Sequence, residues 1–273
     1  MENKYPIYIP SKGRANECYT ANLLLKYKID IIIVVEPNDY FNYLQNYNKK
    51  ILLKLDANNK GLSYVRNFIK LHSIKNKDNY HWQFDDDIKQ FQIRKKGKNI
   101  NVNPLKILLK IEKYLSQYKN IAIAGLRDCV FAWTQKQEIS VNKLIASGFI
   151  INNNVKNTWS DNMIEDVDYC LQVLLKGYCT IIFNRFLYMK KPNNQADGGQ
   201  SFIKYEQLNK NLVNKYPNIL KLRFDKKRKI YKMAPSRIWE KFTQRLILKN
   251  QSTKKLILKN QISYSKLDFM KQN

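Results

Sequence analysis

The sequence predicts an α/β fold, a Rossmann-like arrangement in which helices flank a mostly parallel sheet. Short apolar runs typical of strands alternate with segments whose apolar residues recur at helical spacing. The run from Asp30 to Glu36 is an almost unbroken series of Ile and Val, which is typical of a strand buried on both faces of a parallel sheet. With 273 residues, the chain can form one large domain, or a domain of about 200 residues with an appendage.

The first third of the chain contains four predicted strands separated by helices. Strands are expected at 5–9, 30–36, 51–55 and 80–84, and helices at 15–27, 39–47 and 62–74. Pro10 and Pro37 end the first two strands because proline has no backbone N–H to donate, and Gly13 allows a tight turn after the first. This alternation predicts right-handed crossover connections.

The pattern continues and then changes character. Helices are expected at 104–118 and 163–176, and strands at 121–126, 144–151 and 178–184. Pro104 suits the first turn of its helix, and Gly177 closes the other helix. We therefore predict a core domain over 1–202 and a basic, mainly helical extension over 203–273. That extension holds Leu246–Gln251 and its near-copy Leu256–Gln261, which we expect to lie on amphipathic helices.

The charge is strongly positive. The chain has 49 Lys and Arg against 22 Asp and Glu, a formal charge of +27, and residues 204–273 carry 19 of the basic residues with only 4 acidic ones. Such an imbalance favours a polyanionic partner through release of counterions. A compositional bias toward Lys, Asn, Ile and Tyr explains the imbalance only in part, because it should raise Glu as well.

No feature indicates secretion or membrane insertion. The chain begins without a basic segment followed by an apolar one, and no apolar run approaches the roughly 20 residues that cross a bilayer. The four cysteines show no close pairing. We expect a soluble protein of the cytoplasm with reduced thiols, in a host cell's cytoplasm if a phage encodes it.

Three consecutive acidic residues, Asp85-Asp86-Asp87, follow the predicted strand at 80–84. Carboxylates at the end of a buried strand repel one another and lose hydration, so a hard cation such as Mg²⁺ or Mn²⁺ would stabilise them. The alternative is a solvated Asp-rich turn after a strand.

Five features occur in order along the chain. They are the segment Ile9-Pro10-Ser11-Lys12-Gly13-Arg14, Glu36 at a strand end, Lys60–Asn67 opening a helix, the Asp triplet, and the acidic helix start Glu165-Asp166-Val167-Asp168. Over roughly residues 5–190 the chain resembles nucleotide-sugar glycosyltransferases of the GT-A fold. It resembles most the group associated with TET/JBP-type base oxidation in phages and kinetoplastids, which is implied to add sugars to hydroxymethylpyrimidines in DNA.

The resemblance implies a nucleotide-sugar donor, a UDP-sugar in the first instance, and a hexosyl- or pentosyltransferase activity. The implied donor-binding residues are Pro10, Ser11, Lys12, Arg14, Glu36, Gly61, Arg66, Asp85 and Asp86. Asp85 and Asp87 are implied to hold Mn²⁺ or Mg²⁺, which would stabilise the leaving group. Many relatives use a later histidine as a further ligand. This chain has no histidine after His81, so the further ligand would be water or another residue, for which Asp197 is a substitute.

Asp166 is the implied general base, with Glu165 and Asp168 as alternatives. A carboxylate near the acceptor hydroxyl would take its proton during transfer. An acidic helix start is also favoured by the helix dipole without any catalytic role, and this alternative stays open.

The acceptor side is predicted from aromatic and basic residues. Phe131, Trp133 and Trp159 could stack on a base flipped out of double-stranded DNA, although aromatic residues are also common in cores. The predicted phosphate-binding residues are Lys226, Lys227, Arg228, Lys229, Arg237, Lys241 and Arg245. A solvated helix face would be rich in lysine as well.

Two further classes of function fit the sequence. One is a glycosyltransferase that modifies protein or envelope glycan while its basic tail rests on an anionic membrane. The other is a DNA-binding protein that has the GT-A scaffold without the catalysis.

Overall fold

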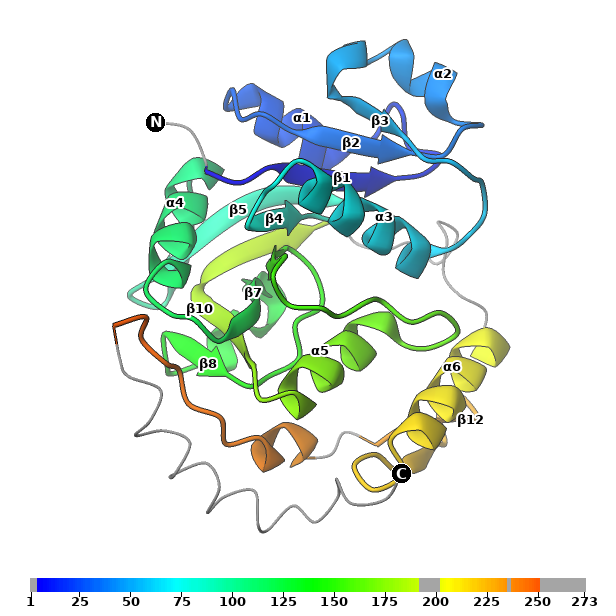
Figure 1. Cartoon of the computed structure of the whole chain (residues 1–273), viewed down its shortest axis with the longest axis vertical. Helices are drawn as coiled ribbons and strands as arrows, with labels where there is room; N and C mark the ends of the chain where they lie inside the picture. The colour runs from blue at the N-terminus through cyan, green and yellow to red at the C-terminus, as the bar shows by residue number, and fades with distance from the viewer. Residues whose placement is uncertain (1–3, 192–201, 235–236, 251–273) are drawn as a thin grey trace.

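The computed structural model describes residues 4–191, 202–234 and 237–250. Within them, ten strands form one central sheet, in the order β3-β2-β1-β4-β9-β7-β10-β5-β6, with β8 beside β10 (Figure 1). The strands are β1 (Ile7–Ser11), β2 (Ile32–Val35), β3 (Leu52–Lys54), β4 (Tyr80–Gln83), β5 (Ile88–Lys95), β6 (Lys98–Asn101), β7 (Ile121–Asp128), β8 (Ile139–Val141), β9 (Phe149–Asn152) and β10 (Cys179–Lys190).

The sheet is mixed but most of its strands share one direction. The pairs β1–β2, β2–β3, β1–β4 and β7–β10 are parallel. Strand β9 runs antiparallel to both β4 and β7, so β7 and β10 again point the same way as β4. The carboxyl ends of β1, β2, β4, β7 and β10 therefore meet at one edge of the sheet.

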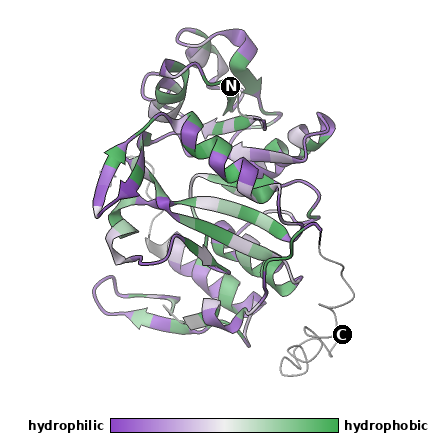
Figure 2. Ribbon diagram, turned by 90° about the vertical axis from the view of Figure 1, so that its left-hand side faces the viewer, coloured by the Kyte–Doolittle hydropathy of each residue, from purple (hydrophilic) through white to green (hydrophobic). Residues whose placement is uncertain are grey.

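Helices cover both faces of the sheet. They are α1 (Tyr19–Lys26), α2 (Tyr40–Leu44), α3 (Leu62–Lys75), α4 (Pro104–Leu115) and α5 (Glu165–Leu175), with the short 3₁₀ turns η1 (Lys49–Ile51) and η2 (Cys129–Thr134). Side chains alternate along β1: Ile7 and Ile9 pack with α1 and α4, whereas Tyr8 packs with α3 on the other face. Hydrophobic residues line the strands of the sheet (Figure 2).

The predicted alternation of strands and helices is confirmed, with differences at the boundaries. The strand expected at 144–151 begins only at Phe149, and the strand expected at 178–184 continues to Lys190, across a register shift between Phe183 and Leu187 in its pairing with β7. The hairpin β5–β6 and strand β8 were not predicted. The hairpin turns at Lys96-Gly97, both at positive φ, which is a recognisable turn signal.

The extension begins as predicted with a helix, α6 (Phe202–Lys215), which packs on α5 through Leu212 and Leu171. Strands β11 (Leu222–Asp225) and β12 (Ile230–Met233) then form an antiparallel hairpin, followed by η3 (Arg237–Lys241). The hairpin was not predicted, and the boundary at residue 202 stays a prediction.

The expectation of helices for the repeated hexapeptide is wrong for its first copy. Residues 246–248 form no helix and lie beside the end of α4, where Tyr118 and Leu248 form an antiparallel bridge, and a turn follows at 249–250. The second copy, Leu256–Gln261, lies outside the described residues.

All four cysteines are free, as the sequence indicates. Among the residues that the structure describes, no helix is long and apolar enough to cross a membrane.

Candidate active site

The polar residues that the sequence singles out gather at the carboxyl edge of the sheet. The segment after β1, Glu36 after β2 and the Asp triplet after β4 reach this edge because their strands are parallel. Helices α3 and α5 begin at the same edge, since each leads back to a strand of that direction. Lys190 lies there too, as the last residue of β10.

The three aspartates of the triplet have different partners. Asp86 faces the β1 loop, where one carboxylate oxygen accepts a hydrogen bond from Ser11 Oγ at 2.6 Å and the other from Arg14 Nη1 at 2.6 Å. Asp85 accepts from Lys190 Nζ at 2.6 Å and from Ser147 Oγ at 2.7 Å. The triplet is thus a hydrogen-bonded cluster and not the solvated turn that was the alternative.

Lys190 lies between the two carboxylates predicted to hold a metal. Its Nζ is 2.6 Å from Asp85 Oδ2 and 3.3 Å from Asp87 Oδ1, the latter a charge contact without hydrogen-bond geometry. Burial alone would raise the pKa of Asp85, but Lys190 and Arg66 hold this pKa below its usual value. Burial raises the pKa of Asp87, and Lys190 offsets part of that rise.

As they lie here, Asp85 and Asp87 do not fit a divalent-metal site, because the ammonium of Lys190 already lies between them and would repel a second cation. No group of three or more His, Cys, Asp or Glu side chains suited to a metal ion is found among the described residues. Asp197, the predicted substitute ligand, lies outside those residues.

Arg66 joins the triplet to the acidic start of α5. Its Nη2 lies 3.7 Å from Asp85 Oδ1 and 3.9 Å from Glu165 Oε1, and only 3% of the residue is exposed. The guanidinium packs against the rings of both Phe149 and Trp159, with 4.8 Å to each ring centroid. Arg66 is therefore a buried, positioned cation rather than a surface charge.

Asp166 is the carboxylate at this edge best suited to bind a proton near neutral pH. Burial and the neighbouring charge of Glu165 raise the pKa of Asp166 to about 6, despite a hydrogen bond from the backbone N–H of Val167 at 2.7 Å. A general base works best when its pKa lies close to the working pH. Of the three predicted candidates, Asp166 therefore has the most suitable electrostatic environment.

Asp168 does not fit the catalytic role that was its alternative assignment. Its carboxylate is fully buried and accepts hydrogen bonds from Lys215 Nζ (2.7 Å), Tyr216 Oη (2.7 Å) and Gln172 Nε2 (2.6 Å). These partners hold the pKa of Asp168 below its usual value in spite of burial. Because Lys215 ends α6, Asp168 ties the extension to α5.

A cavity of about 450 Å³ is lined by five of the nine predicted donor-binding residues, including Ser11, which hydrogen-bonds Asp86 of the triplet. It is lined by Pro10, Ser11, Lys12, Val34, Glu36, Leu55, Asn59, Gly61, Leu62, Val65 and Lys204. Glu36 is buried. It forms an ion pair with Lys12 Nζ at 2.9 Å and accepts a hydrogen bond from the backbone N–H of Asn59 at 2.9 Å. Gly61 adopts a φ of 85°, a left-handed conformation that favours glycine where α3 begins.

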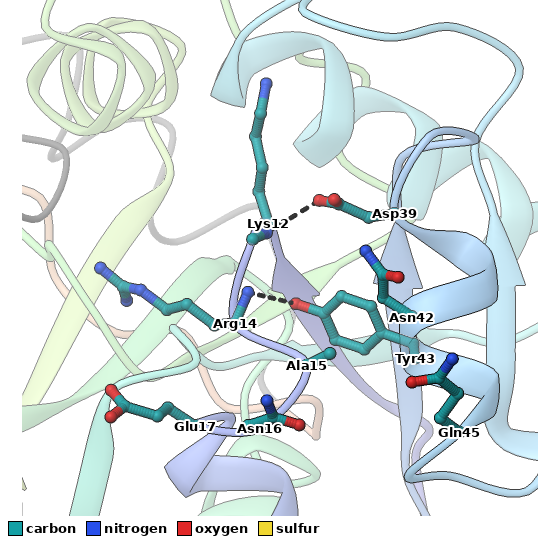
Figure 3. Close-up of a pocket in the computed structure, with 10 residues that line it drawn as sticks. Lys12, Arg14, Ala15, Asn16, Glu17, Asp39, Asn42, Tyr43 and Gln45 are labelled. Atoms are coloured by element: carbon teal, nitrogen blue, oxygen red, sulfur yellow. Dashed lines mark hydrogen bonds between the residues drawn. The ribbon is translucent and has the colours of Figure 1, made fainter.

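A second and more polar cavity, of about 640 Å³, lies across the β1 loop (Figure 3). Tyr43 Oη accepts a hydrogen bond from the backbone N–H of Arg14 at 3.2 Å, and Asp39 accepts one from that of Gly13 at 2.8 Å. These contacts fix the loop that carries Lys12 and Arg14. The cavity is larger than the first, but neither Glu36 nor Gly61 lines it.

The aromatic residues predicted on the acceptor side separate into two groups. Turn η2 follows β7 at the same edge and exposes Val130 (58%), Phe131 (57%) and Trp133 (74%). Trp159, in contrast, is 2% exposed and stacks between Arg66 and Tyr169, so the expectation that it stacks on a flipped base is wrong. Its observed role is to support Arg66.

The predicted phosphate-binding residues lie on the extension. Lys226, Lys227, Arg228 and Lys229 are exposed and form the turn between β11 and β12, while Lys241 and Arg245 are exposed beyond it. Arg237 begins η3. Their binding to nucleic acid stays a prediction.

Sequence reasoning missed Lys190 and Ser147. Lys190 is one basic residue among 49 Lys and Arg, and Ser147 lies in a loop without a recognisable motif. The need for a glycine after Ser147 becomes visible only in the tertiary structure. Gly148 has a φ of 59°, and a Cβ there would lie 3.3–3.4 Å from the rings of Tyr188 and Phe84.

Three solved structures resemble the fold at a distance. A197 from STIV is 12% identical with a TM-score of 0.41, covering 71% of this chain and 87% of that one. GalNAc-T7, solved with UDP, GalNAc and Mn²⁺, is 8% identical with a TM-score of 0.48, covering 78% and 48%. The 4-diphosphocytidyl-2C-methyl-D-erythritol synthase of Anaerococcus prevotii DSM 20548 is 9% identical with a TM-score of 0.40, covering 75% and 97%. No curated protein matches the chain.

A family model matches most of the chain. The model of the TET-associated glycosyltransferases aligns with residues 5–199, a span that includes the β1 loop, the Asp triplet and the start of α5. The observed sheet and the order of these site elements agree with the GT-A architecture expected of such enzymes. The chain therefore belongs to the TET-associated glycosyltransferase family.

Proposed function

We propose that this glycosyltransferase moves a hexose or pentose from a nucleoside-diphosphate sugar, a UDP-sugar in the first instance, to the hydroxyl of a hydroxymethylpyrimidine in DNA. We further propose that it acts in the cytoplasm. The observation that carries the proposal is the convergence of a nucleotide-sized cavity, the triplet with its cations, and Asp166 at one edge of the sheet. Glycosyl transfer itself follows from the family.

The first cavity is the proposed donor site. Its apolar walls, Val34, Leu55 and Val65, suit a nucleoside base, and Glu36 can accept hydrogen bonds from the base or ribose. The diphosphate would then extend past Ser11 toward the triplet. Arg14, held by Asp86, supplies positive charge on that path.

Asp166 is the proposed general base. In the transfer step, the acceptor oxygen forms a bond to the anomeric carbon while the bond from that carbon to the phosphate oxygen breaks. The electron pair stays on the phosphate, and the acceptor's proton passes to Asp166. A carboxylate with a pKa of about 6 is largely ionised at neutral pH and still binds a proton readily.

Two features support a DNA acceptor. The exposed aromatic residues of η2 offer a stacking surface at the edge that holds the site, and aromatic faces can hold a base outside the duplex. The basic turn of Lys226–Lys229 offers a surface for phosphates.

The direct test incubates the purified chain with hydroxymethylated duplex DNA and a panel of UDP-sugars, then digests the DNA and weighs the nucleosides. The expected result is a nucleoside heavier by one sugar, absent with Asp166→Asn. No mass gain with any UDP-sugar would contradict the proposed donor or acceptor. Donor hydrolysis without transfer would place the fault with the acceptor.

Binding assays distinguish the proposed function from the two alternatives, a glycosyltransferase at an anionic membrane and a non-catalytic DNA-binding protein. Lys226→Ala/Lys227→Ala should weaken duplex binding several-fold and reduce its salt dependence, whereas Lys49→Ala/Lys50→Ala, two exposed lysines of η1, should not. Retention on anionic liposomes with no DNA shift at the same salt would favour a membrane-bound acceptor. DNA binding without any donor turnover would favour the non-catalytic function.

A further inference from the structure

Lys190 occupies the place where the family resemblance would put a divalent cation. It reaches this place because β10 pairs with β5, which sets Lys190 opposite Ile88, the residue that follows the triplet. The backbone N–H of Lys191 also donates to the carbonyl of Asp87 at 2.9 Å. The lysine is thus held beside the carboxylates by strand pairing as well as by charge.

Side-chain cations already contact the triplet. Asp85, Asp86 and Asp87 meet Lys190, Arg66 and Arg14, and Arg66 is shared with Glu165. Asp85 also accepts from Ser147, so the hydrogen-bonding capacity of that oxygen is already used. A divalent ion between Asp85 and Asp87 would have to displace the ammonium.

Lys190 retains the means to contact a ligand. An ammonium has three N–H donors, and Asp85 accepts from one of them. The side chain is 27% exposed, so it is neither sealed in the core nor free in solvent. Donors at such a half-buried point suit the oxygens of a phosphate group.

We propose that the ammonium of Lys190, fixed between Asp85 and Asp87, replaces the divalent metal ion and itself binds the diphosphate of the sugar donor. This inference rests on the proposed nucleoside-diphosphate donor. When the bond between the anomeric carbon and the phosphate oxygen breaks, Lys190 donates a hydrogen bond to the oxygen that keeps the electron pair. Asp85 and Asp87 position the lysine and do not contact the donor.

The first test measures Mn²⁺ binding directly. Mn²⁺ is titrated into the wild-type chain, with and without UDP, and free Mn²⁺ is followed by electron paramagnetic resonance against a blank that contains UDP alone. The expected result is the free-ion signal of the blank. Binding of Mn²⁺ that Asp87→Asn abolishes would overturn the inference.

The second test measures UDP affinity by calorimetry in EDTA. Lys190→Ala should lose about tenfold to hundredfold in affinity, the loss expected for a charge-assisted contact, while Lys190→Arg should keep most of it. Lys191→Ala is the matched control, because Lys191 pairs with Glu17 outside the site. Mn²⁺ should partly restore the affinity of Lys190→Ala, since the space between the carboxylates is then free.

The outcomes separate the two proposals. A wild-type affinity that falls more than tenfold on chelation, or Lys190→Ala binding as well as wild type in EDTA, would overturn the role of Lys190. If UDP and a panel of other nucleoside diphosphates all fail to bind, the proposed donor fails. The Mn²⁺ titration then still decides whether the lysine excludes the metal.

Discussion

One carboxylate in each acidic cluster of the site, Asp85 in the triplet after β4 and Asp166 at the start of α5, shows the opposite pKa shift to the other. In the triplet, Lys190 and Arg66 keep the pKa of Asp85 low although burial opposes this. At the start of α5, burial and a like charge raise the pKa of Asp166 to about 6. Neighbouring cations thus favour the ionised form of Asp85, whereas burial and a like charge favour protonation of Asp166.

The same contrast recurs over a single helical turn. Asp166 and Asp168 are two residues apart in α5, but Asp168 points toward α6, where Lys215 and Tyr216 stabilise its charge. The pKa of Asp168 is lowered and that of Asp166 is raised. Both residues are aspartates, so the difference in their pKa comes from the partners that tertiary packing places beside each carboxylate.

Loss of the proton acceptor should have the largest effect. Asp166→Asn should lower kcat about a hundredfold to ten-thousandfold, because the amide cannot take the acceptor's proton. Steady-state assays of sugar transfer measure this. In the wild type, kcat/KM should rise with pH through about 6 as Asp166 ionises. A variant with more than a tenth of wild-type kcat would show that Asp166 is not the base.

Loss of the anchor should act on stability instead. Asp168→Asn should lower the free energy of unfolding by about 2–4 kcal/mol at pH 7, because it leaves Lys215 and Tyr216 without their buried anionic acceptor. Urea denaturation measures the change, with the exposed Asp161→Asn as control. Unchanged stability together with lost activity would return Asp168 to the list of catalytic candidates.

Asp166→Asn should become more stable than the wild type as the pH rises. Below pH about 4, Asp166 is largely protonated in both the folded and unfolded states, so its ionisation does not lower the free energy of unfolding. As the pH rises from about 4 to about 6, the unfolded chain ionises first, so the native state loses stability. The variant should therefore match the wild type near pH 3.5 and exceed it by about 1–2 kcal/mol at pH 8. Equal stabilities at pH 8, measured in urea, would contradict the raised pKa.

Weakening the link between the clusters should have the smallest effect. Arg66→Lys should lower kcat/KM about tenfold, because lysine keeps the charge but lacks the planar guanidinium that packs against Phe149 and Trp159 while reaching Asp85 and Glu165. Trp159→Phe, which keeps a ring beside the guanidinium, should lose less. A larger loss with Trp159→Phe than with Arg66→Lys would point to a direct role for the tryptophan.

Local patterns in the sequence determined the order of strands and helices and the places of most acidic candidates. Apolar periodicity, with Pro10 and Pro37 at strand ends, predicted parallel strands whose carboxyl ends meet. That topology brings Glu36, the triplet and the start of α5 to one edge without further information. The turn at Lys96-Gly97 is also a local signal, so the hairpin β5–β6 could have been predicted from the sequence.

Only the tertiary structure decided which charges meet. Lys190 is 105 residues from Asp85 in sequence, and nothing sets it apart among 49 Lys and Arg until β10 pairs with β5. The burial of Trp159 beside Arg66 and the ties of Asp168 to α6 are equally long-range. Periodicity reports which face of an element is apolar, whereas the partner of a charge depends on how distant elements pack, and that partner sets whether a carboxylate holds a cation or a proton.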